Sequence, residues 1–324
     1  MSRIQPVVSV IIPCYRGERF IMEAIDSVLS QADDAVEVLV VDDGSPDRSA
    51  ELVAAAGDRR VQLLRHEGNR GIAAARNTGL ARAQGEFIAF LDQDDLWRKG
   101  RLEAQLRVLR DDQAGNVVLV FCDTLVRDEA GREWRGHGVP PRVREFPPPA
   151  LLAALVREKF VILGAALIRR RALLAAGTFD ESIRGGSDDF DMLVRLAERG
   201  AFAHVPEPLF LRRLHAANYT SAELMIEESL VVIDRVGVRH PGLGRAVRIG
   251  RARKFYRRAS DALVIGAHAR ARADYARALR AWPWQPRAWL GLALCAAGPV
   301  GRALLAGWRR MRGERRDGEY GNLL

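Results

Sequence analysis

Cysteine is scarce in this chain of 324 residues. The sequence contains three, Cys14, Cys122 and Cys295, which lie far apart. A disulfide framework needs paired cysteines and a structural zinc site needs closely spaced ones, so the sequence indicates neither. Isolated thiols are typical of a reducing compartment, and we therefore expect a cytoplasmic protein.

Long apolar runs are also missing. A helix that spans a bilayer needs roughly 18 to 20 apolar residues, and no run reaches that length. Residues 288–301 come nearest, but they are too short and contain Pro299. The apolar run near the start is short and rich in Val and Ile, which indicates a strand and not a secretory signal. We expect a soluble protein, or a peripheral one on the inner face of the plasma membrane.

Acidic residues are outnumbered by basic ones. The chain has 50 Lys and Arg against 41 Asp and Glu, a formal net charge of +9 and a pI near 10.1. This balance favours an anionic partner, which could be nucleic acid, a membrane surface or a phosphorylated substrate. However, the aromatic-interleaved basic motifs of single-strand binders are absent. No G-x-G-x-x-G follows the first expected strand, which argues against a dinucleotide-dependent dehydrogenase.

Short apolar runs alternate with segments of helical spacing in the first part of the chain. Runs rich in Val and Ile predict strands that are buried on both faces. The expected strands are residues 7–13, 36–41, 61–65, 87–91 and 117–122, and the expected helices are residues 19–31, 72–83 and 99–110, with another that opens at Pro46 after the N-cap candidate Ser45. This order predicts an α/β fold with an open, doubly wound, mostly parallel sheet.

Polar clusters follow three of these strands. They are residues 13–15, Asp42 with Asp43, and the acids of residues 92–95. In open α/β sheets ligands bind at the carboxyl ends of the strands, so we expect the clusters to share one site. On an extended backbone Asp92 and Asp94 would project to the same side and offer hard oxygen ligands to Mg²⁺ or Mn²⁺. The alternative is a polar loop that caps the next helix.

The amino-acid composition changes in the second half of the chain. Residues 123–149 are rich in Arg, Gly and Pro and predict a hairpin or mobile loop. A Gly-rich turn then leads into a helix at residues 190–199, and residues 202–211 indicate an edge strand interrupted by Pro206 and Pro208. The expected helices beyond residue 221 are residues 222–237, 243–281, 285–297 and 300–310. We therefore expect a catalytic domain at residues 1–220 and an α-helical, Arg-rich region at residues 221–324.

The end of the chain carries a group of arginines. They are Arg309, Arg310, Arg312, Arg315 and Arg316, near Trp308. A basic amphipathic segment of this kind could contact an anionic membrane surface. A solvated helix with a disordered tail is the alternative.

Five stretches together resemble the family 2 glycosyltransferases, which have the GT-A fold and use nucleotide-sugar donors. The stretches are VSVIIPCYRGERFIMEAIDSVLSQ, VEVLVVDDGSPDRS, NRGIAAARNTGLARAQGEFIAFLDQDDLW, GGSDDFDMLVRLAERG and LRRLHAANYT. They occur in the family's order and cover about residues 7 to 220. The resemblance implies a Rossmann-like, mostly parallel GT-A sheet, to which the helical C-terminal extension would be added.

The resemblance assigns a nucleotide-sugar site. Asp43 would accept a hydrogen bond from the base, usually uracil, in a pocket lined by Pro13 and Tyr15. The remaining donor contacts would come from Asn69, Arg76, Asp92 and Gln93. Ordinary alternatives exist, namely a turn with a helix cap at DDGS and a solvated helix arginine at residue 76.

The resemblance also implies a divalent metal, Mn²⁺ or Mg²⁺. Asp94 is the principal candidate ligand, with Asp92, Asp95 and His215 as further candidates. A nucleoside diphosphate leaves with negative charge that a cation offsets, and neutral imidazole can ligate a metal. A surface histidine is the alternative for His215.

The candidate base lies at Asp189, with Asp188 second. Family members usually have Glu-Asp here, and this chain has Asp-Asp. The base would take the acceptor's proton in a single displacement that inverts the anomeric carbon. Acids at a helix start are also common for purely structural reasons.

We expect an inverting, metal-dependent glycosyltransferase that acts in cell-surface polysaccharide or glycolipid synthesis. Its partners would be a nucleotide-sugar, for which the family resemblance favours UDP, and a glycan or lipid-linked acceptor, with no nucleic acid. A catalytically inactive GT-A-like scaffold and a nucleic-acid-binding protein are the competing hypotheses.

Overall fold

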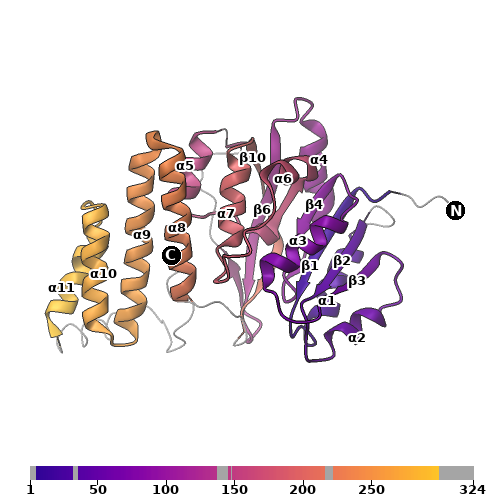
Figure 1. Ribbon diagram of the computed structural model, residues 1–324, viewed down its shortest axis with the longest axis horizontal. Coiled ribbons are helices and arrows are strands. Elements are labelled where there is room, and N and C mark those ends of the chain that lie inside the picture. The colour runs from indigo at the N-terminus through magenta and orange to yellow at the C-terminus, as the bar shows by residue number, and fades with distance from the viewer. Residues whose placement is uncertain (1–4, 32–35, 137–144, 147, 216–221, 299–324) are drawn as a thin grey trace. The chain divides into compact units, whose positions relative to one another are not determined.

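The chain forms two compact units. The computed structural model describes residues 5–31, 36–136, 145–146, 148–215 and 222–298 (Figure 1). The first unit comprises Met1–Leu152 and Lys159–Thr220, and the second comprises Ala153–Glu158 and Ser221–Leu324. The expected helix at residues 300–310 and the arginine group that follows lie outside the described residues.

A sheet of ten strands is the centre of the first unit, in the order β3-β2-β1-β4-β9-β6-β10-β5, with β7 beside β6 and β8 beside β10. Six of the ten strands run in one direction, while β9 runs against both β4 and β6. The strands are β1 (Val8–Cys14), β2 (Val36–Asp42), β3 (Val61–Arg65), β4 (Phe87–Phe90), β5 (Leu96–Trp97), β6 (Val117–Arg127), β7 (Glu133–Arg135), β8 (Glu145–Phe146), β9 (Ala166–Arg169) and β10 (Ala201–Arg213). The predicted mixed α/β architecture with a mostly parallel sheet is confirmed.

The first two strands end level with each other. Val8 pairs with Val36 and Cys14 pairs with Asp42, so the register is unbroken along the whole of both strands. Every residue of both strands is buried, as their continuous apolar sequences predict. The backbone N–H of Asp43 donates to the carbonyl of Cys14 at 2.7 Å, which extends the ladder one step into the loop. The polar residues after β1 and β2 therefore share one edge of the sheet.

The prediction of an edge strand at residues 202–211 is wrong. β10 pairs with β6 on one side, and with β8 and β5 on the other. Pro206 and Pro208 are accommodated because β10 has register shifts against β6 at this point, and its pairing with β8 and β5 lies before and after them. The expected hairpin within residues 123–149 is confirmed, since β7 folds back on β6 around Gly131, which has a φ of 78°.

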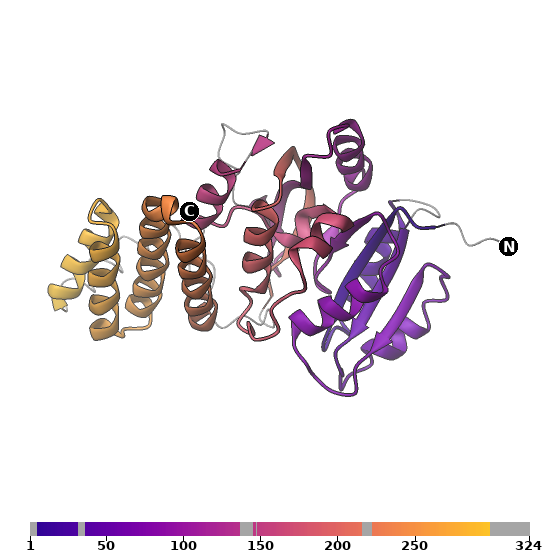
Figure 2. The same cartoon turned by 45° about the horizontal axis from the view of Figure 1, so that its top comes forward.

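Helices cover both faces of the sheet (Figures 1 and 2). The helices and short 3-10 turns of this part are α1 (Ile21–Leu29), α2 (Ser49–Ala54), α3 (Ile72–Arg82), α4 (Arg101–Asp111), α5 (Ala150–Arg157), η1 (Leu163–Ala165), α6 (Arg170–Ala176) and α7 (Asp188–Ala197). Helices α1 and α4 pack on the face that carries Val8, Val10 and Ile12. Helix α3 packs on the opposite face, where a Cβ added at Gly79 would lie 2.4 Å from Ile11 Cγ2. The absent side chain therefore sets how closely α3 approaches β1.

Two polar side chains of α4 are buried against the middle of the sheet. Arg101 lies over the Trp97 ring and donates to the carbonyl of Ala166, and the Gln105 amide donates to the carbonyls of Val120 and Ala165. Burial lowers the pKa of Arg101 to about 10, because the low-dielectric surroundings disfavour the cation. These donors satisfy carbonyls next to and within β9.

Ser45 is not the N-cap of α2. The helix begins at Ser49, and the Ser45 hydroxyl instead accepts a hydrogen bond from the backbone N–H of Arg16 at 3.1 Å. The Ser49 hydroxyl accepts one from the N–H of Gly17. The DDGS turn is thus fastened to the loop that follows β1.

The second unit is helical. Its elements beyond residue 221 are α8 (Ala222–Arg239), η2 (Pro241–Leu243), α9 (Gly244–Val264), α10 (His268–Ala281) and α11 (Pro286–Ala296), and both views show these helices side by side in chain order. The single helix expected at residues 243–281 is two helices, because Gly266 adopts a φ of 80° and ends α9. Among the described residues, no helix is both long enough and apolar enough to cross a bilayer.

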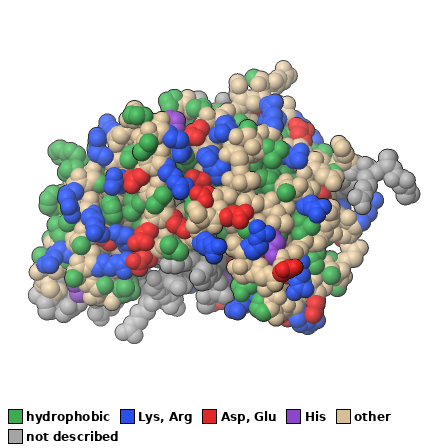
Figure 3. All heavy atoms as spheres, in the orientation of Figure 1, with side chains coloured by type: hydrophobic (Ala, Val, Ile, Leu, Met, Phe, Trp, Pro, Cys, Tyr) green, Lys and Arg blue, Asp and Glu red, His purple; other side chains and the backbone are tan. Residues whose placement is uncertain are grey.

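Small residues and buried ion pairs hold these helices together. A Cβ on Gly291 would lie 2.3 Å from the ring of Tyr275, so α11 meets α10 at very short range. Asp274 is buried and accepts hydrogen bonds from Arg258 at 2.7 and 2.8 Å and from Arg277 at 2.9 Å. On the face in Figure 3, basic side chains over this unit are interspersed with acidic ones.

Candidate active site

Asp43 organises the loop between β3 and α3. One carboxylate oxygen accepts the backbone N–H of Arg70 at 2.9 Å, and the other accepts that of Gly71 at 2.8 Å. His66 Nδ1 lies 2.6 Å from the same oxygen as Arg70. The Asp43 carboxylate, which the sequence predicts to contact the base, therefore also holds the backbone of this loop in place by hydrogen bonds.

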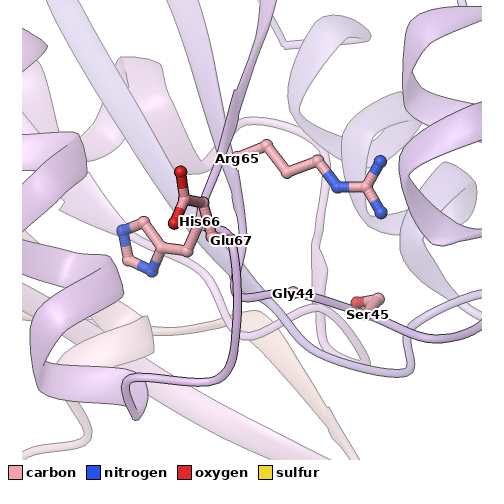
Figure 4. A pocket seen from close by; sticks show the side chains of 5 residues that line it. All are labelled: Gly44, Ser45, Arg65, His66 and Glu67. Atoms are coloured by element: carbon pink, nitrogen blue, oxygen red, sulfur yellow. The ribbon is translucent and has the colours of Figure 1, made fainter.

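His66 is a site residue that no motif pointed to. Its Nε2 lies 2.9 Å from the Thr78 hydroxyl, so the buried ring links Asp43 to α3. A pocket of about 530 Å³ opens beside it, lined by Gly44, Ser45, Arg65, His66 and Glu67. Figure 4 shows Arg65 and His66 extending to opposite sides of the end of β3. The signal in the sequence that could have identified His66 is its position directly after an expected strand. No motif assigned a role to that position.

Gln93 holds the loop after β1. Its amide oxygen accepts the N–H of Tyr15 at 2.9 Å, and its amide nitrogen donates to the Tyr15 carbonyl at 3.0 Å. This pair ties the acidic turn to the loop after β1, in which the Tyr15 side chain is exposed, while Pro13 is buried within β1 itself. Gln93 and Tyr15, both predicted to contact the donor, are therefore coupled to each other through their polar groups.

The acids of residues 92–95 lie in a turn and not on extended backbone. The N–H of Asp95 donates to the carbonyl of Asp92 at 3.0 Å, which closes the turn. The expectation that Asp92 and Asp94 lie on extended backbone is wrong for this reason, and within the turn the two acids have different partners. Asp92 contacts Arg76 and Asp94 contacts His215.

Arg76 joins two acidic motifs that are far apart in the sequence. It donates to Asp188 at 2.6 Å and to Asp92 at 3.1 Å. The Arg76 side chain is 6% exposed and Asp188 is 1% exposed, whereas Asp92 is 45% exposed. Burial disfavours the Arg76 cation, but Asp188 and Asp92 outweigh it and the pKa is raised. Arg76 was expected to touch the nucleotide, and here its guanidinium is held inside the site.

Asp94 and His215 form the second pair. His215 Nε2 lies 2.9 Å from an Asp94 oxygen, and its ring packs on Phe20 at 4.7 Å between centroids. Burial raises the pKa of Asp94, the charge of Asp92 adds to the rise, and His215 opposes it. The predicted neighbourhood of these two residues is thus present, although they lie 121 positions apart.

Asp95 has a different setting from the other acids. It is buried and accepts the backbone N–H of Arg213 at 3.0 Å, where β10 ends. Burial raises the pKa of Asp95 well above its ordinary value, and the charge of Asp94 adds to the rise. Asp95 thereby anchors the end of β10 beside the acidic turn.

The residues of this edge fit a hard divalent cation. Carboxylate oxygens and one imidazole nitrogen are donors that Mn²⁺ or Mg²⁺ accepts, and a nearby like charge that raises the pKa of Asp94 is relieved by a cation. In the described part of the chain no three His, Cys, Asp or Glu side chains already form a metal cluster. Mg²⁺ is commonly bound through one or two carboxylates together with substrate phosphates, so the pair of Asp92 and Asp94 with His215 suits a metal that arrives with a diphosphate.

The two acids at the start of α7 differ in what they touch. Asp188 is closed off by Arg76, and burial raises its pKa while Arg76 opposes the rise. Asp189 contacts Lys159 through Oδ2, and its side chain is 15% exposed. Both lie in the first helical turn, where the helix dipole stabilises negative charge. Of the two, Asp189 has the freer carboxylate.

The two asparagines of the NRGIAAARN stretch lie in different surroundings. Asn69 is exposed on the loop before α3. Asn77, which the sequence left without a role, accepts the N–H of Phe179 at 2.8 Å and donates to the Phe179 carbonyl at 3.0 Å. Phe179 packs edge-on against Phe90 of β4. Asn77 thus fixes the segment that leads to α7.

The sequence and the fold match those of a known family. The family model described as glycosyl transferase family 2 matches residues 9–175, just over half of the chain. The chain belongs to glycosyl transferase family 2, and the family predicted from the motifs is confirmed. The protein is similar to an uncharacterized glycosyltransferase of Bacillus subtilis, EpsJ, with 31% identity over 218 residues, which are 64% of this chain and 61% of EpsJ. The match therefore spans less than two thirds of that relative.

A second relative is the putative teichuronic acid biosynthesis glycosyltransferase TuaG of Bacillus subtilis. It is 40% identical over 113 residues, which are 34% of this chain and 45% of TuaG.

Solved structures share the whole fold. TarS 1–349 of S. aureus in complex with UDP-GlcNAc aligns with a TM-score of 0.63 at 19% identity, covering 97% of this chain and 93% of TarS. The mannosyltransferase PcManGT of Pyrobaculum calidifontis, in complex with GDP-Man and Mn²⁺, aligns with a TM-score of 0.60 at 22% identity, covering 96% and 82%. The architecture is thus the predicted GT-A fold with a helical C-terminal region.

Proposed function

We propose that the protein is an inverting, metal-dependent glycosyltransferase that moves a hexosyl group from a nucleotide-sugar to a hydroxyl of a glycan or lipid-linked acceptor. The observation that carries the proposal is the Arg76 bridge. It joins Asp92 of the acidic turn to Asp188 of α7, so the expected donor and base motifs meet at one edge of the sheet. A purely structural use of these acids would not require the two motifs to converge.

Each acid is given one role. Asp189 takes the proton from the acceptor hydroxyl as the hydroxyl oxygen attacks the anomeric carbon. Attack from the face opposite the diphosphate gives inversion in one displacement. The divalent cation would be held by Asp94, Asp92 and His215. Asp95 would be a further candidate ligand. When bound, that cation would offset the charge of the leaving diphosphate.

The donor we propose is UDP-linked. Asp43 and the loop it fastens would form the base pocket with Pro13 and Tyr15, and Asn69 would reach the nucleotide from the exposed side. The UDP-GlcNAc complex of TarS and the GDP-Man complex of PcManGT support a nucleotide-sugar and give the two donors to test.

The setting we propose is the synthesis of cell-surface polysaccharide or glycolipid. Its support is the similarity to TuaG, named for teichuronic acid biosynthesis. All three cysteines are free, which agrees with a reducing compartment, and we propose a cytoplasmic location.

A thermal-shift panel tests the proposal. UDP, UDP-GlcNAc and GDP-Man are added with Mn²⁺, and then with a chelator in place of the metal. We expect stabilisation that needs the metal, and loss of nucleotide release in Asp189→Asn with donor binding kept. If no nucleotide stabilises the protein with any metal, the proposal fails. Full turnover by Asp189→Asn would move the base elsewhere, first to Asp188.

A further inference from the structure

The carboxylate of Asp189 is held from one side only. Lys159, which follows α5 in the chain, contacts Oδ2 of Asp189. The other oxygen, Oδ1, is buried and accepts no hydrogen bond from any residue that the structure describes. A buried acceptor that lacks a donor costs free energy, so its persistence beside a paired oxygen calls for a functional reason.

The backbone at Lys159 is firmly placed. Phe160 and Val161 are buried directly after it, and the Phe160 ring packs on Phe121 of β6 at 5.9 Å between centroids. The Lys159 side chain is 26% exposed, and its ammonium group approaches Asp189 from a fixed backbone position at the margin of the site. Its position is therefore set by the core of the first unit and not by a surface loop.

The use of lysine at this point is unusual for this chain. The sequence contains three lysines, Lys99, Lys159 and Lys254, among its 50 basic residues. The neighbouring Asp188 is paired with an arginine. A guanidinium can take both oxygens of a carboxylate in a planar fork, whereas an ammonium is a point charge that can hold one oxygen and leave the second to another partner.

We propose that Lys159 is a positioning residue for the candidate base, which holds Oδ2 of Asp189 and so fixes the orientation of the carboxylate that receives the proton of the acceptor hydroxyl. The terminal torsion of aspartate is soft, and one fixed oxygen is enough to orient the other. The inference rests on the proposed glycosyl transfer.

The step balances without any further reactant. The acceptor oxygen forms its bond to the anomeric carbon, and the bond between that carbon and the diphosphate oxygen breaks. The diphosphate leaves with the electron pair of the broken bond. The hydroxyl proton passes to the Asp189 carboxylate, and Lys159 keeps its own protons throughout.

The scarcity of lysine makes the contact directly measurable. Reductive methylation with ¹³C-formaldehyde labels the three lysines and the N-terminus and keeps their charge, and Lys159→Arg identifies the Lys159 signal. We expect Asp189→Asn to move that signal to the position of an exposed lysine. Asp191→Asn is the matched control on the same helix and should leave the signal in place, because Asp191 pairs with Arg195. If the Lys159 signal does not move in Asp189→Asn, the proposal is overturned.

Turnover then separates positioning from general support of the fold. The probes are UDP-GlcNAc and GDP-Man, with release of the nucleoside diphosphate as the readout. We expect Lys159→Gln to lower kcat at least about tenfold with the donor KM unchanged, because misorientation affects the chemical step. Lys159→Arg should restore part of the lost kcat. Lys99→Gln, which changes an exposed lysine, should not lower kcat.

The outcomes distinguish this inference from the function it rests on. If Lys159→Gln keeps the wild-type kcat while Asp189→Asn is inactive, the positioning role is wrong and the glycosyltransferase stands. If kcat falls only together with donor binding and thermal stability, Lys159 supports the fold and the inference is again wrong. If the wild-type protein releases no nucleotide and binds none, both fail together.

Discussion

The acids at the carboxyl edge of the sheet have different counterparts. Asp43 faces His66 and two backbone N–H groups, Asp94 faces His215, and Asp189 faces Lys159. Asp92 and Asp188 share Arg76. Like charges gathered at one edge would repel, and these separate partners explain how the chain folds with them in place.

Removal of Arg76 should be costly for stability. In Arg76→Ala the carboxylate of Asp188 would remain buried without its cation, and we expect a loss of about 3–5 kcal/mol in the free energy of unfolding. Urea denaturation measures it. Arg107→Ala is the control, since Arg107 and Glu103 form an exposed pair and should contribute less than about 1 kcal/mol. Equal losses in the two variants would contradict the buried role of Arg76.

His66 should affect nucleotide binding through Asp43. In His66→Ala, Asp43 loses its buried side-chain partner but keeps the N–H groups of Arg70 and Gly71. We expect about 1–3 kcal/mol of lost stability and weaker binding of UDP with Mn²⁺ in calorimetric titration. Thr78→Val keeps the His66–Asp43 contact and should bind UDP nearly as well as the wild type. Unchanged affinity in His66→Ala would show that the pocket does not depend on this ring.

The cysteines should differ in reactivity. Burial raises the pKa of Cys14 to about 12, so the neutral thiol is favoured and little of the reactive thiolate exists at pH 8. Cys14 is also 1% exposed, whereas Cys295 is partly exposed. Iodoacetamide at pH 8 followed by peptide mass spectrometry should find Cys295 modified first. The rate at Cys14 should rise with pH throughout the range below 12, and rapid labelling of Cys14 in the folded protein at pH 8 would contradict this.

Sequence motifs located the acids and placed His215 near Asp94, but they did not locate the partners of Asp43 and Asp189. Asp43, Asp92, Asp94 and Asp189 lie at strand ends or a helix start, where the pattern alone places them. Lys159 lies 30 positions before Asp189, in a segment without a motif, and only the packing of Phe160 brings it near. The assigned roles of the site residues remain proposals, whereas the family and the fold are confirmed.

At the scale of elements, periodicity predicted most strands and helices but not their order in the sheet. β3 at Val61–Arg65 agrees with its prediction, and α3 at Ile72–Arg82 ends one residue short. The direction of β9 could not be predicted because an antiparallel strand of four buried residues has the same apolar pattern as a parallel one. The break at Gly266 was missed because Ala- and Arg-rich sequence on both sides continues to favour helix.

The contact between α3 and β1 should depend on Gly79. A Cβ there would lie 2.4 Å from Ile11 Cγ2, so Gly79→Ala should push the helix from the sheet and cost about 1–3 kcal/mol. Chemical denaturation checks the loss. The double variant Gly79→Ala with Ile11→Ala should lose less than the sum of the single changes, because the smaller residue removes the clash. Additive losses would mean that the two positions are not in contact.

At the scale of the whole molecule, two units of different construction occur in one chain. The first is built around a sheet and the second around helices α8–α11. The domain boundary near residue 220 remains a prediction. Ala153–Glu158 belong to the helical unit by their contacts, a detail that no linear pattern could give because these residues precede the last strands of the sheet.

Calorimetry should resolve the two units. We expect two thermal transitions, of which UDP with Mn²⁺ raises only the one that belongs to the sheet, since a ligand stabilises the part that binds it. Gly79→Ala should lower that same transition. Asp274→Ala should lower the other, because it leaves Arg258 without its buried partner. A single transition that all three changes shift would show that the chain unfolds as one cooperative body.

The reversed strand β9 also imposes an order on assembly during synthesis. The first four strands can pair with one another once the ribosome has released about 90 residues, whereas the other neighbour of β4 is β9. β6 must wait for Ala166–Arg169, and so must the side chains of Arg101 and Gln105, whose acceptors are the carbonyls of Ala165 and Ala166. The nascent protein therefore carries β4 and β6 with open edges on the side where β9 will lie, and it is most prone to misassociation in that interval.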